Sequence, residues 1–264
     1  MPFDLAAYCA RVGVDPVRPD TAGLAALQQA QLRAVVFENF DPLLGRIPAL
    51  EPDALSAKIV GHGRGGYCHE LNSLFEQALR ALGFPVVRML ARVRMRAGKQ
   101  APRTHLVLRV KVEGRRFLAD AGFGGPGSLM PLDLASRAEQ RAPNGTFRLI
   151  DDPDSGEVVL ERLATAGWAQ VYAFDGAYVS DGEVAAANHL CATWNQAPFG
   201  SHLMLNAYLG DARYGLFDRM LTIERAEGSE SRELRDFGEF EALIAETGLK
   251  LDPADLAAAW EKLA

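Results

Sequence analysis

The sequence contains only three cysteines in 264 residues, and Cys9, Cys68 and Cys191 are far apart. Small secreted domains that depend on disulfides use dense, even-numbered cysteine frameworks, which this chain does not have. Sparse, unclustered cysteines are instead typical of a reducing compartment. The chain also carries a net charge of −6, so it lacks the basic excess expected of a nucleic-acid-binding protein.

Long apolar runs are missing as well. No segment approaches the roughly 20 consecutive apolar residues that a membrane helix requires. The first residues do not combine a basic region with an apolar core, as a secretory signal does. We therefore expect a cytoplasmic protein that binds neither membranes nor nucleic acid.

One stretch is locally basic and contains Arg88, Arg92, Arg94, Arg96 and Lys99. Its arginines alternate with apolar residues, which is typical of the solvated face of a strand. The alternative is a patch that binds an anionic ligand.

Hydrophobic periodicity divides the chain into three parts. Residues 1–84 indicate helices, residues 85–180 indicate antiparallel strands in a barrel or sandwich, and residues 181–264 mix both types. The expected strands are 86–95, 104–112, 116–119, 147–150, 158–163, 168–174, 202–208 and 221–225. The expected helices of the last part are 182–193, 237–246 and one that begins at 253.

The clearest chemical signal is a glycine-rich segment, residues 61–66, that leads into Cys68. Apolar residues recur at helical spacing from Leu71 to Leu82, so Cys68 falls in the first turn of an amphipathic helix. The partial positive charge and free N–H groups of a helix N-terminus favour a thiolate and can bind an oxyanion. This segment predicts a nucleophilic cysteine; a buried structural thiol stays open as the alternative.

A metal site is not expected at this segment. Cys68, His69 and His62 are close in sequence, but no second pair of ligands accompanies them as in zinc sites.

A nucleophilic thiol needs a base and a group that orients the base. His105 opens an expected strand, on the less apolar face with Val107 and Arg109, from which it could reach a pocket without entering the core. Asp120 ends the next strand, just before a Gly-rich segment. A role for Asp120 in the turn alone is the competing interpretation.

Taken together, these segments resemble the arylamine N-acetyltransferases. Residues 64–72 match an Arg-Gly-Gly-x-Cys-x-Glu-x-Asn motif, residues 104–106 match Thr-His-Leu, and residues 120–124 match Asp-x-Gly-Phe-Gly. Residues 37–40 are similar to the Pro-Phe-Glu-Asn-Leu segment of that family, and residues 188–199 to the stretch before its lid. The resemblance extends from about residue 25 to residue 225.

The resemblance implies an α+β fold with a papain-like Cys-His-Asp triad. The helical bundle, residues 1–84, would carry Cys68; the antiparallel β-barrel, residues 85–180, would carry His105 and Asp120; residues 181–264 would form an α/β lid. It further implies ping-pong transfer of an acetyl group from acetyl-CoA, as co-substrate, through Cys68 to an arylamine, hydrazine or N-hydroxyarylamine. No metal takes part, and the protein would be a monomer or homodimer.

The resemblance also implies a substrate and CoA cleft lined by Phe37, Phe123, Gly124 and Phe199, and a supporting pair of Glu38 and Arg64. A plain core position is the alternative for each phenylalanine. The chain departs from the family between 192 and 199, where Ala-Thr-Trp-Asn-Gln-Ala-Pro-Phe replaces the common Ser-Thr-His-Pro-x-Ser-x-Phe. The preferred acyl donor is therefore left open.

Three other functions stay open as alternatives. An amide synthase of the same fold would use the same triad to release a polyketide acyl chain from a carrier. A papain-like or transglutaminase-like hydrolase would share the order of Cys, His and Asp but not the segment around Arg64. A non-catalytic binding protein would leave Cys68 inert.

Overall fold

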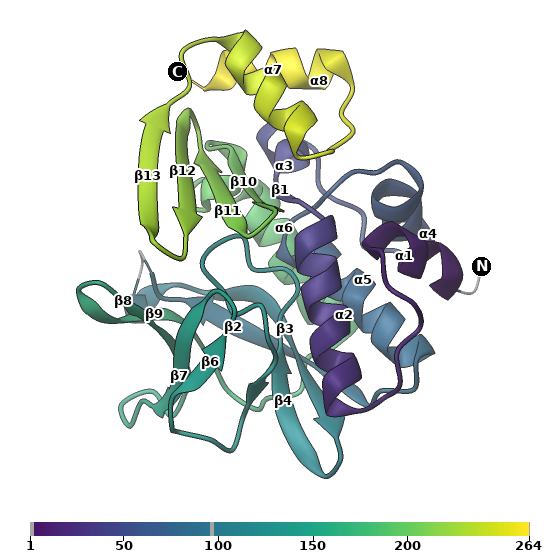
Figure 1. Cartoon of the computed structure of the whole chain (residues 1–264), viewed down its shortest axis with the longest axis vertical. Helices are drawn as coiled ribbons and strands as arrows, with labels where there is room; N and C mark the ends of the chain where they lie inside the picture. The colour runs from purple at the N-terminus through teal and green to yellow at the C-terminus, as the bar shows by residue number, and fades with distance from the viewer. Residues whose placement is uncertain (1–2, 96–97, 264) are drawn as a thin grey trace.

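The computed structural model describes residues 3–95 and 98–263, so Arg96 of the basic stretch lies outside the described residues. The helices of the N-terminal third lie beside a large antiparallel sheet, and a smaller sheet lies above the large one in the view of Figure 1. The helices of the first third are α1 (Leu5–Val12), α2 (Thr21–Ala34), α3 (Phe40–Leu43), α4 (Pro52–Leu55) and α5 (Cys68–Ala81), with a π-helical turn at Ser56–Gly61. No helix in the described part of the chain is long and apolar enough to cross a membrane.

Side-chain caps explain where several helices begin. The carboxylate of Asp20 accepts a hydrogen bond of 2.8 Å from the N–H of Gly23 and so satisfies a free donor of α2. Helix α5 ends before Gly83, whose φ of +86° is the left-handed conformation that glycine adopts easily. Ser180 and Asp252 cap α6 (Asp181–Thr193) and α8 (Pro253–Lys262) in the same way as Asp20.

The large sheet is the expected antiparallel barrel, nearly closed, with strand order β5-β4-β3-β2-β9-β8-β7-β6. The strands are β2 (Val86–Val93), β3 (Arg103–Val112), β4 (Arg115–Ala119), β5 (Leu132–Asp133), β6 (Gln140–Ala142), β7 (Gly145–Asp151), β8 (Val158–Ala164) and β9 (Gly167–Phe174). A tight turn at Glu113 and Gly114, both with positive φ, joins β3 to β4.

The small sheet has the order β1-β10-β11-β12-β13 and packs against α7 (Phe237–Glu246) and α8. Its first strand, β1 (Phe37–Glu38), comes from the N-terminal third: Phe37 pairs with Asn206 of β10. The other strands are β10 (Met204–Leu209), β11 (Ala212–Phe217), β12 (Met220–Arg225) and β13 (Gly228–Glu233).

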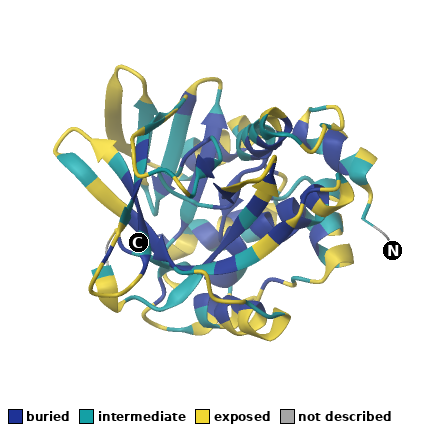
Figure 2. Cartoon of the chain, turned by 90° about the horizontal axis from the view of Figure 1, so that it is seen from below, coloured by how far each residue is buried: buried dark blue, intermediate teal, exposed yellow. Residues whose placement is uncertain are grey.

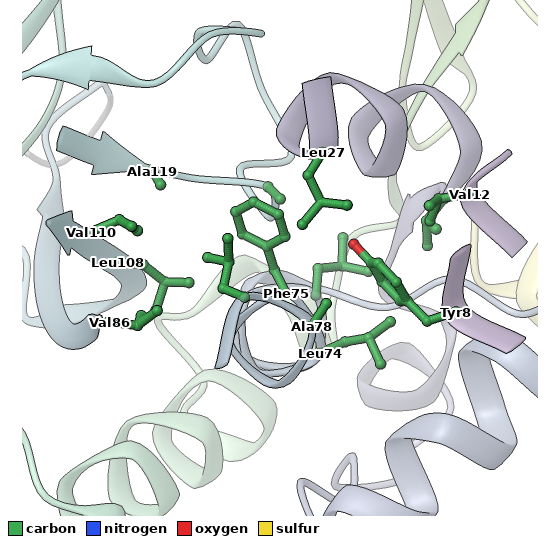
Figure 3. Close-up of a cluster of buried hydrophobic side chains, with 14 of the residues drawn as sticks. Tyr8, Val12, Leu27, Leu74, Phe75, Ala78, Val86, Leu108, Val110 and Ala119 are labelled. Carbon is green, nitrogen blue, oxygen red and sulfur yellow. The ribbon is translucent and has the colours of Figure 1, made fainter. Parts of the chain in front are cut away.

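Helix α5 is packed between the helices and the barrel. Phe75 and Ala78 of α5 are fully buried and lie in one apolar cluster with residues of α1, α2 and the strands β2 to β4. Figure 3 shows these side chains converging on α5 from both sides. Buried residues run through the inner helices and strands, whereas hairpin tips are exposed (Figure 2). This packing fixes the helix that carries Cys68 relative to β3.

The predicted α+β class and barrel are confirmed, while the boundaries at residues 84 and 180 stay a prediction. Sequence patterns missed five strands: β1, β5, β6, β11 and β13. The expectation that His105 stays outside the core was wrong, because His105 and Val107 are buried inside the barrel while Leu108 and Val110 are buried against α5. A barrel strand covered by a helix has no solvated face.

Candidate active site

Cys68 is the first residue of α5, as the sequence predicts. The N–H of Tyr67, the residue before it, donates to the carboxylate of Glu70 at 3.1 Å, which closes the helix start. Cys68 is only 5% exposed, and its Sγ lies 4.0 Å from the carbonyl oxygen of Thr104, next to His105 on β3. The structure therefore brings the thiol to the strand that carries the predicted base.

Burial raises the pKa of the Cys68 thiol well above its ordinary value, and the neighbouring Cys191 and Asp120 raise it further. The backbone N–H groups of Leu106 and His69 act in the opposite direction and are outweighed. Loss of the thiol proton to solvent is therefore unfavourable. A thiolate at this position requires an acceptor for the proton inside the site.

His105 and Asp120 form a buried pair in which Nε2 lies 2.7 Å from Oδ2. Burial alone would raise the pKa of Asp120, but His105 and hydrogen bonds from His105, Asn72 and the N–H of Gly122 hold it below its ordinary value. An ionised Asp120 accepts the proton of Nε2–H, so the neutral imidazole has its lone pair on Nδ1. Nδ1 is the nitrogen that can act as a base.

Asn72 holds Asp120 in place, a role that the sequence reasoning missed. Its Nδ2 donates to Asp120 Oδ1 at 2.9 Å and to the carbonyl oxygen of Leu106 at 2.6 Å. Its Oδ1 accepts the N–H of Ala121 at 2.9 Å. The signal that could have found it is position: Asn72 is one helical turn after Cys68, so both share a face of α5.

Gln28 and Tyr172 also reach the pair from distant segments. Gln28 Oε1 accepts the N–H of Asp120 at 3.2 Å. The ring of Tyr172 lies 5.0 Å from the ring of His105, and burial followed by the charge of Asp120 raises the pKa of Tyr172. Neither residue belongs to a recognisable motif, so no sequence signal pointed to them.

The predicted cleft residues lie against one another and against the site. Phe123 makes an edge contact with His105, and their ring centres are 5.1 Å apart. The ring centres of Phe199 and Phe37 are 6.5 Å apart. At Gly124 a Cβ atom would lie 2.3 Å from the ring of Phe37, so only glycine fits beneath that ring. The approach of a pantetheine arm to Gly124 stays a prediction, and it requires Phe37 to move.

The predicted support pair is present beneath the start of α5. Arg64 Nη2 lies 2.8 Å from Glu38 Oε1, and the Glu38 side chain is fully buried. Lys58 joins the cluster with Nζ 2.6 Å from both Asp41 Oδ2 and Glu70 Oε1. Glu38, Asp41 and Glu70 therefore share two partly buried cations, Arg64 and Lys58. Burial raises the pKa of Glu70 to about 7; Lys58 opposes this rise and the charge of Glu38 adds to it.

The basic stretch is not a free anion-binding patch at the arginines described. Arg88 binds Glu76 and Asp181, and Arg92 is 3.3 Å from Glu157. Arg94 has a fully buried side chain, 2.8 Å from Asp152 and 2.6 Å from Glu157, so the expectation of a solvated face is wrong there. Its partners come from the end of β7 and the start of β8, which the sequence does not place beside it.

In the described ranges, no cluster of three or more His, Cys, Asp or Glu side chains is arranged to hold a metal ion.

Comparison with known proteins gives one consistent result. Residues 20–256 match the family described as N-acetyltransferase. The chain is 37% identical over 209 residues to the arylamine N-acetyltransferase / N-hydroxyarylamine O-acetyltransferase of Salmonella typhimurium, covering 78% of this chain and 74% of that protein. It is 35% identical to the arylamine N-acetyltransferase of Escherichia coli, covering 94% of this chain and 89% of that one.

Solved structures agree. The Mycobacterium marinum arylamine N-acetyltransferase in complex with CoA superimposes with a TM-score of 0.92 at 30% identity, covering 99% of this chain and 100% of the other. The Salmonella typhimurium enzyme gives 0.91 at 33% identity, covering 97% of each chain. The chain therefore belongs to the arylamine N-acetyltransferase family.

Proposed function

We propose that this protein transfers an acetyl group from acetyl-CoA to arylamines, hydrazines or N-hydroxyarylamines, by a ping-pong mechanism through an acetyl thioester on Cys68. The observation that carries the proposal is the buried His105–Asp120 pair, whose His105 is in β3 next to Thr104, the residue that the Cys68 thiol faces. Membership of the arylamine N-acetyltransferase family, with a CoA complex among its solved structures, supports the donor and the acceptor class.

The first step is transfer of the thiol proton from Cys68 to Nδ1 of His105. Burial opposes release of this proton to solvent, but an internal transfer creates a thiolate beside an imidazolium and leaves the net charge of the site unchanged. Asp120 stabilises the imidazolium through Nε2. Cys68, His105 and Asp120 thus act as a triad.

The thiolate then attacks the thioester carbonyl of acetyl-CoA. The free N–H groups of the first turn of α5 stabilise the oxyanion of the tetrahedral intermediate. Collapse of the intermediate breaks the bond to the CoA sulfur, and His105 returns a proton to that leaving thiolate. In the second half-reaction the amine attacks acetyl-Cys68, His105 takes its proton, and the thiolate leaves.

The aromatic side chains of the cleft favour an aromatic acceptor. Phe123 borders the base, and Phe37 and Phe199 form the adjoining apolar wall. An aromatic amine buries its ring against such a wall and presents its nitrogen to the thioester. Phe37 must leave its place over Gly124 for the donor to enter along that route.

The experiment is to incubate the protein with acetyl-CoA, without an amine, and to measure its intact mass beside Cys68→Ala. We expect one acetyl adduct on the unaltered protein and none on the variant, and we expect an added aniline or hydrazine to remove the adduct as the N-acetyl product. No adduct on folded protein with an alkylatable Cys68 would overturn acetyl-CoA as the donor and favour an amide synthase with a bulkier donor.

A further inference from the structure

Two thiols converge on one backbone carbonyl. The carbonyl oxygen of Thr104 lies 4.0 Å from Sγ of Cys68 and 3.8 Å from Sγ of Cys191. Cys68 begins α5, whereas Cys191 is in the last turn of α6. Residues far apart in the chain thus place a second thiol beside the nucleophile.

The two helices are joined close to these cysteines. The hydroxyl of Tyr67, the residue before Cys68, donates to the backbone carbonyl of Asn188 at 3.1 Å and to its side-chain oxygen. Asn188 Nδ2 in turn donates to the carbonyl of Pro48 at 3.0 Å. Asn188 is three residues before Cys191, and residues at this spacing share a helix face, so both lie on the side of α6 turned toward Tyr67 and β3. The junction therefore holds the Cys191 thiol next to Cys68.

Cys191 takes no part in the proposed acetyl transfer. It is 3% exposed, and burial raises its pKa to about 11, so it is a protonated thiol that does not compete with Cys68 for acetyl-CoA. A small apolar side chain would fill its volume equally well. Cys191 is distinguished by its position: its Sγ faces the carbonyl oxygen of Thr104, which Sγ of Cys68 also faces.

We propose that Cys68 and Cys191 form an oxidative modification site, in which a hydroperoxide oxidises Cys68 and Cys191 then closes a reversible disulfide. The proposal rests on the proposed function in one respect: His105 must generate the Cys68 thiolate that attacks the peroxide. Hydrogen peroxide is small enough to reach a thiol that is 5% exposed, whereas Cys191 reacts only through Cys68.

The chemistry balances in two steps. The Cys68 thiolate attacks one oxygen of the peroxide and the O–O bond breaks, which leaves a sulfenic acid on Cys68. The His105 imidazolium gives its proton to the departing oxygen, which leaves as water or an alcohol. The sulfur of Cys191 then attacks the sulfenic sulfur: an S–S bond forms, the S–O bond breaks, and the departing hydroxide takes the thiol proton of Cys191 and leaves as water. Sulfur is oxidised and the peroxide is reduced.

This disulfide would protect the nucleophile. An isolated sulfenic acid goes on to sulfinic and sulfonic acids, which thiols do not reduce. A disulfide stops the oxidation at a stage that cellular thiols reverse, as for the transient disulfides of reducing compartments. Acetylation of Cys68 would block the reaction, because the thioester sulfur is not a free nucleophile.

The test treats reduced protein with hydrogen peroxide and then maps the disulfide-linked peptides by mass spectrometry. Parallel samples receive dithiothreitol before acetyl transfer to an aniline is measured. We expect a linked Cys68–Cys191 peptide, loss of activity, and recovery of nearly all activity with dithiothreitol. Cys191→Ala should be active before oxidation. After peroxide treatment its Cys68 should carry added oxygen, and dithiothreitol should restore almost none of its acetyl-transfer activity.

Cys9→Ala is the matched control, because Cys9 is equally buried but packs in the helical core around α1. It should behave like the unaltered protein. Cys191→Ser, with a thermal melt of every variant, covers the case in which alanine disturbs α6. Absence of the linked peptide, or equal recovery of Cys191→Ala, would overturn the inference.

Acetylation of each reduced sample by acetyl-CoA separates this inference from the proposed function. An acetyl adduct on Cys68 without a linked peptide overturns the disulfide alone. A linked peptide in protein that accepts no acetyl group supports the disulfide and overturns the proposed function.

Discussion

Nδ2 of Asn72 donates a hydrogen bond of 2.9 Å to Oδ1 of Asp120, and Asn72 lies one helical turn after Cys68. The nucleophile and the group that fixes the carboxylate therefore share one helix face. The other oxygen, Oδ2, faces His105, so Asp120 is held from both sides. Any displacement of α5 changes the position of the thiol and of the His105–Asp120 pair together.

Asp120→Asn should lower the reactivity of Cys68 toward iodoacetamide near neutral pH. The amide cannot stabilise the imidazolium as a carboxylate does, and a loss of about 1.4 kcal/mol lowers the thiolate population about tenfold. The rate of Cys68 alkylation, followed by mass spectrometry, measures this. Urea-unfolded protein is the control, since both forms should then react equally. An unchanged rate in the folded variant would remove Asp120 from the triad.

Arg64→Ala should lower both the melting temperature and the activity. The substitution leaves the fully buried Glu38 carboxylate without its guanidinium partner, and loss of one member of a buried pair costs roughly 3–5 kcal/mol. Arg137→Ala is the matched control, because the Arg137–Asp151 pair is exposed and screened by solvent. Thermal unfolding of both variants checks the prediction, and equal melting temperatures would contradict it.

Glu70→Gln should change how stability depends on pH. The pKa of Glu70 is about 7 in the folded protein against an ordinary value of 4.5, so the folded state binds a proton that the unfolded chain has released. Stability from this group is complete below pH 4.5 and is lost as the pH rises through 7, by about 3 kcal/mol. The glutamine variant lacks this loss.

Urea unfolding of both proteins between pH 5 and 8 measures the effect of Glu70. The difference in unfolding free energy isolates Glu70, because Asp41 and Asp120 have lowered pKa values that act in the opposite sense in both proteins. Parallel pH profiles would show that Glu70 is ionised throughout.

His69→Phe should stabilise the protein. His69 is fully buried, and among the residues that the structure describes neither ring nitrogen has a hydrogen-bond partner at bonding distance, although the Thr104 carbonyl is near the ring. An unsatisfied buried polar group costs about 1–3 kcal/mol, which the phenyl ring avoids. Burial and the neighbouring His105 lower the pKa of His69 to about 3, so stability from this group is lost as the pH falls from 6.5 toward 3.

The advantage of the His69→Phe variant should therefore grow in acid, as measured by urea unfolding at pH 7 and 5. His62→Phe serves as the control at an exposed position. A less stable His69→Phe protein would mean that the imidazole is satisfied in solution.

Sequence patterns predicted those parts of the molecule whose cause is local. The end of α6 at Thr193, both ends of α7 and the start of α8 at Pro253 follow from a few neighbouring residues. The placement of Cys68 follows from the glycine-rich segment and the apolar stripe after it. Helix dipoles, caps and periodicity act over one or two turns, so the sequence displays them directly.

The parts that could not be predicted depend on contacts between distant segments. Strand β13 is polar and fully exposed, so no alternation of apolar residues marks it. The two-residue strand β1 forms because β10 and the backbone of Gly66, both distant in sequence, supply its pairing partners. Gln28 and Tyr172 reach the His105–Asp120 pair across the fold, and the burial of His105 follows from barrel closure.

Strand β1 has a consequence for how the protein is made. Phe37 pairs with Asn206 and also forms a bridge with Gly66, which lies two residues before Cys68. During synthesis, the ribosome must deliver the chain beyond residue 206 before this junction can close. A shortened protein that ends within the barrel would hold Cys68, His105 and Asp120 and yet lack the strand that completes their surroundings.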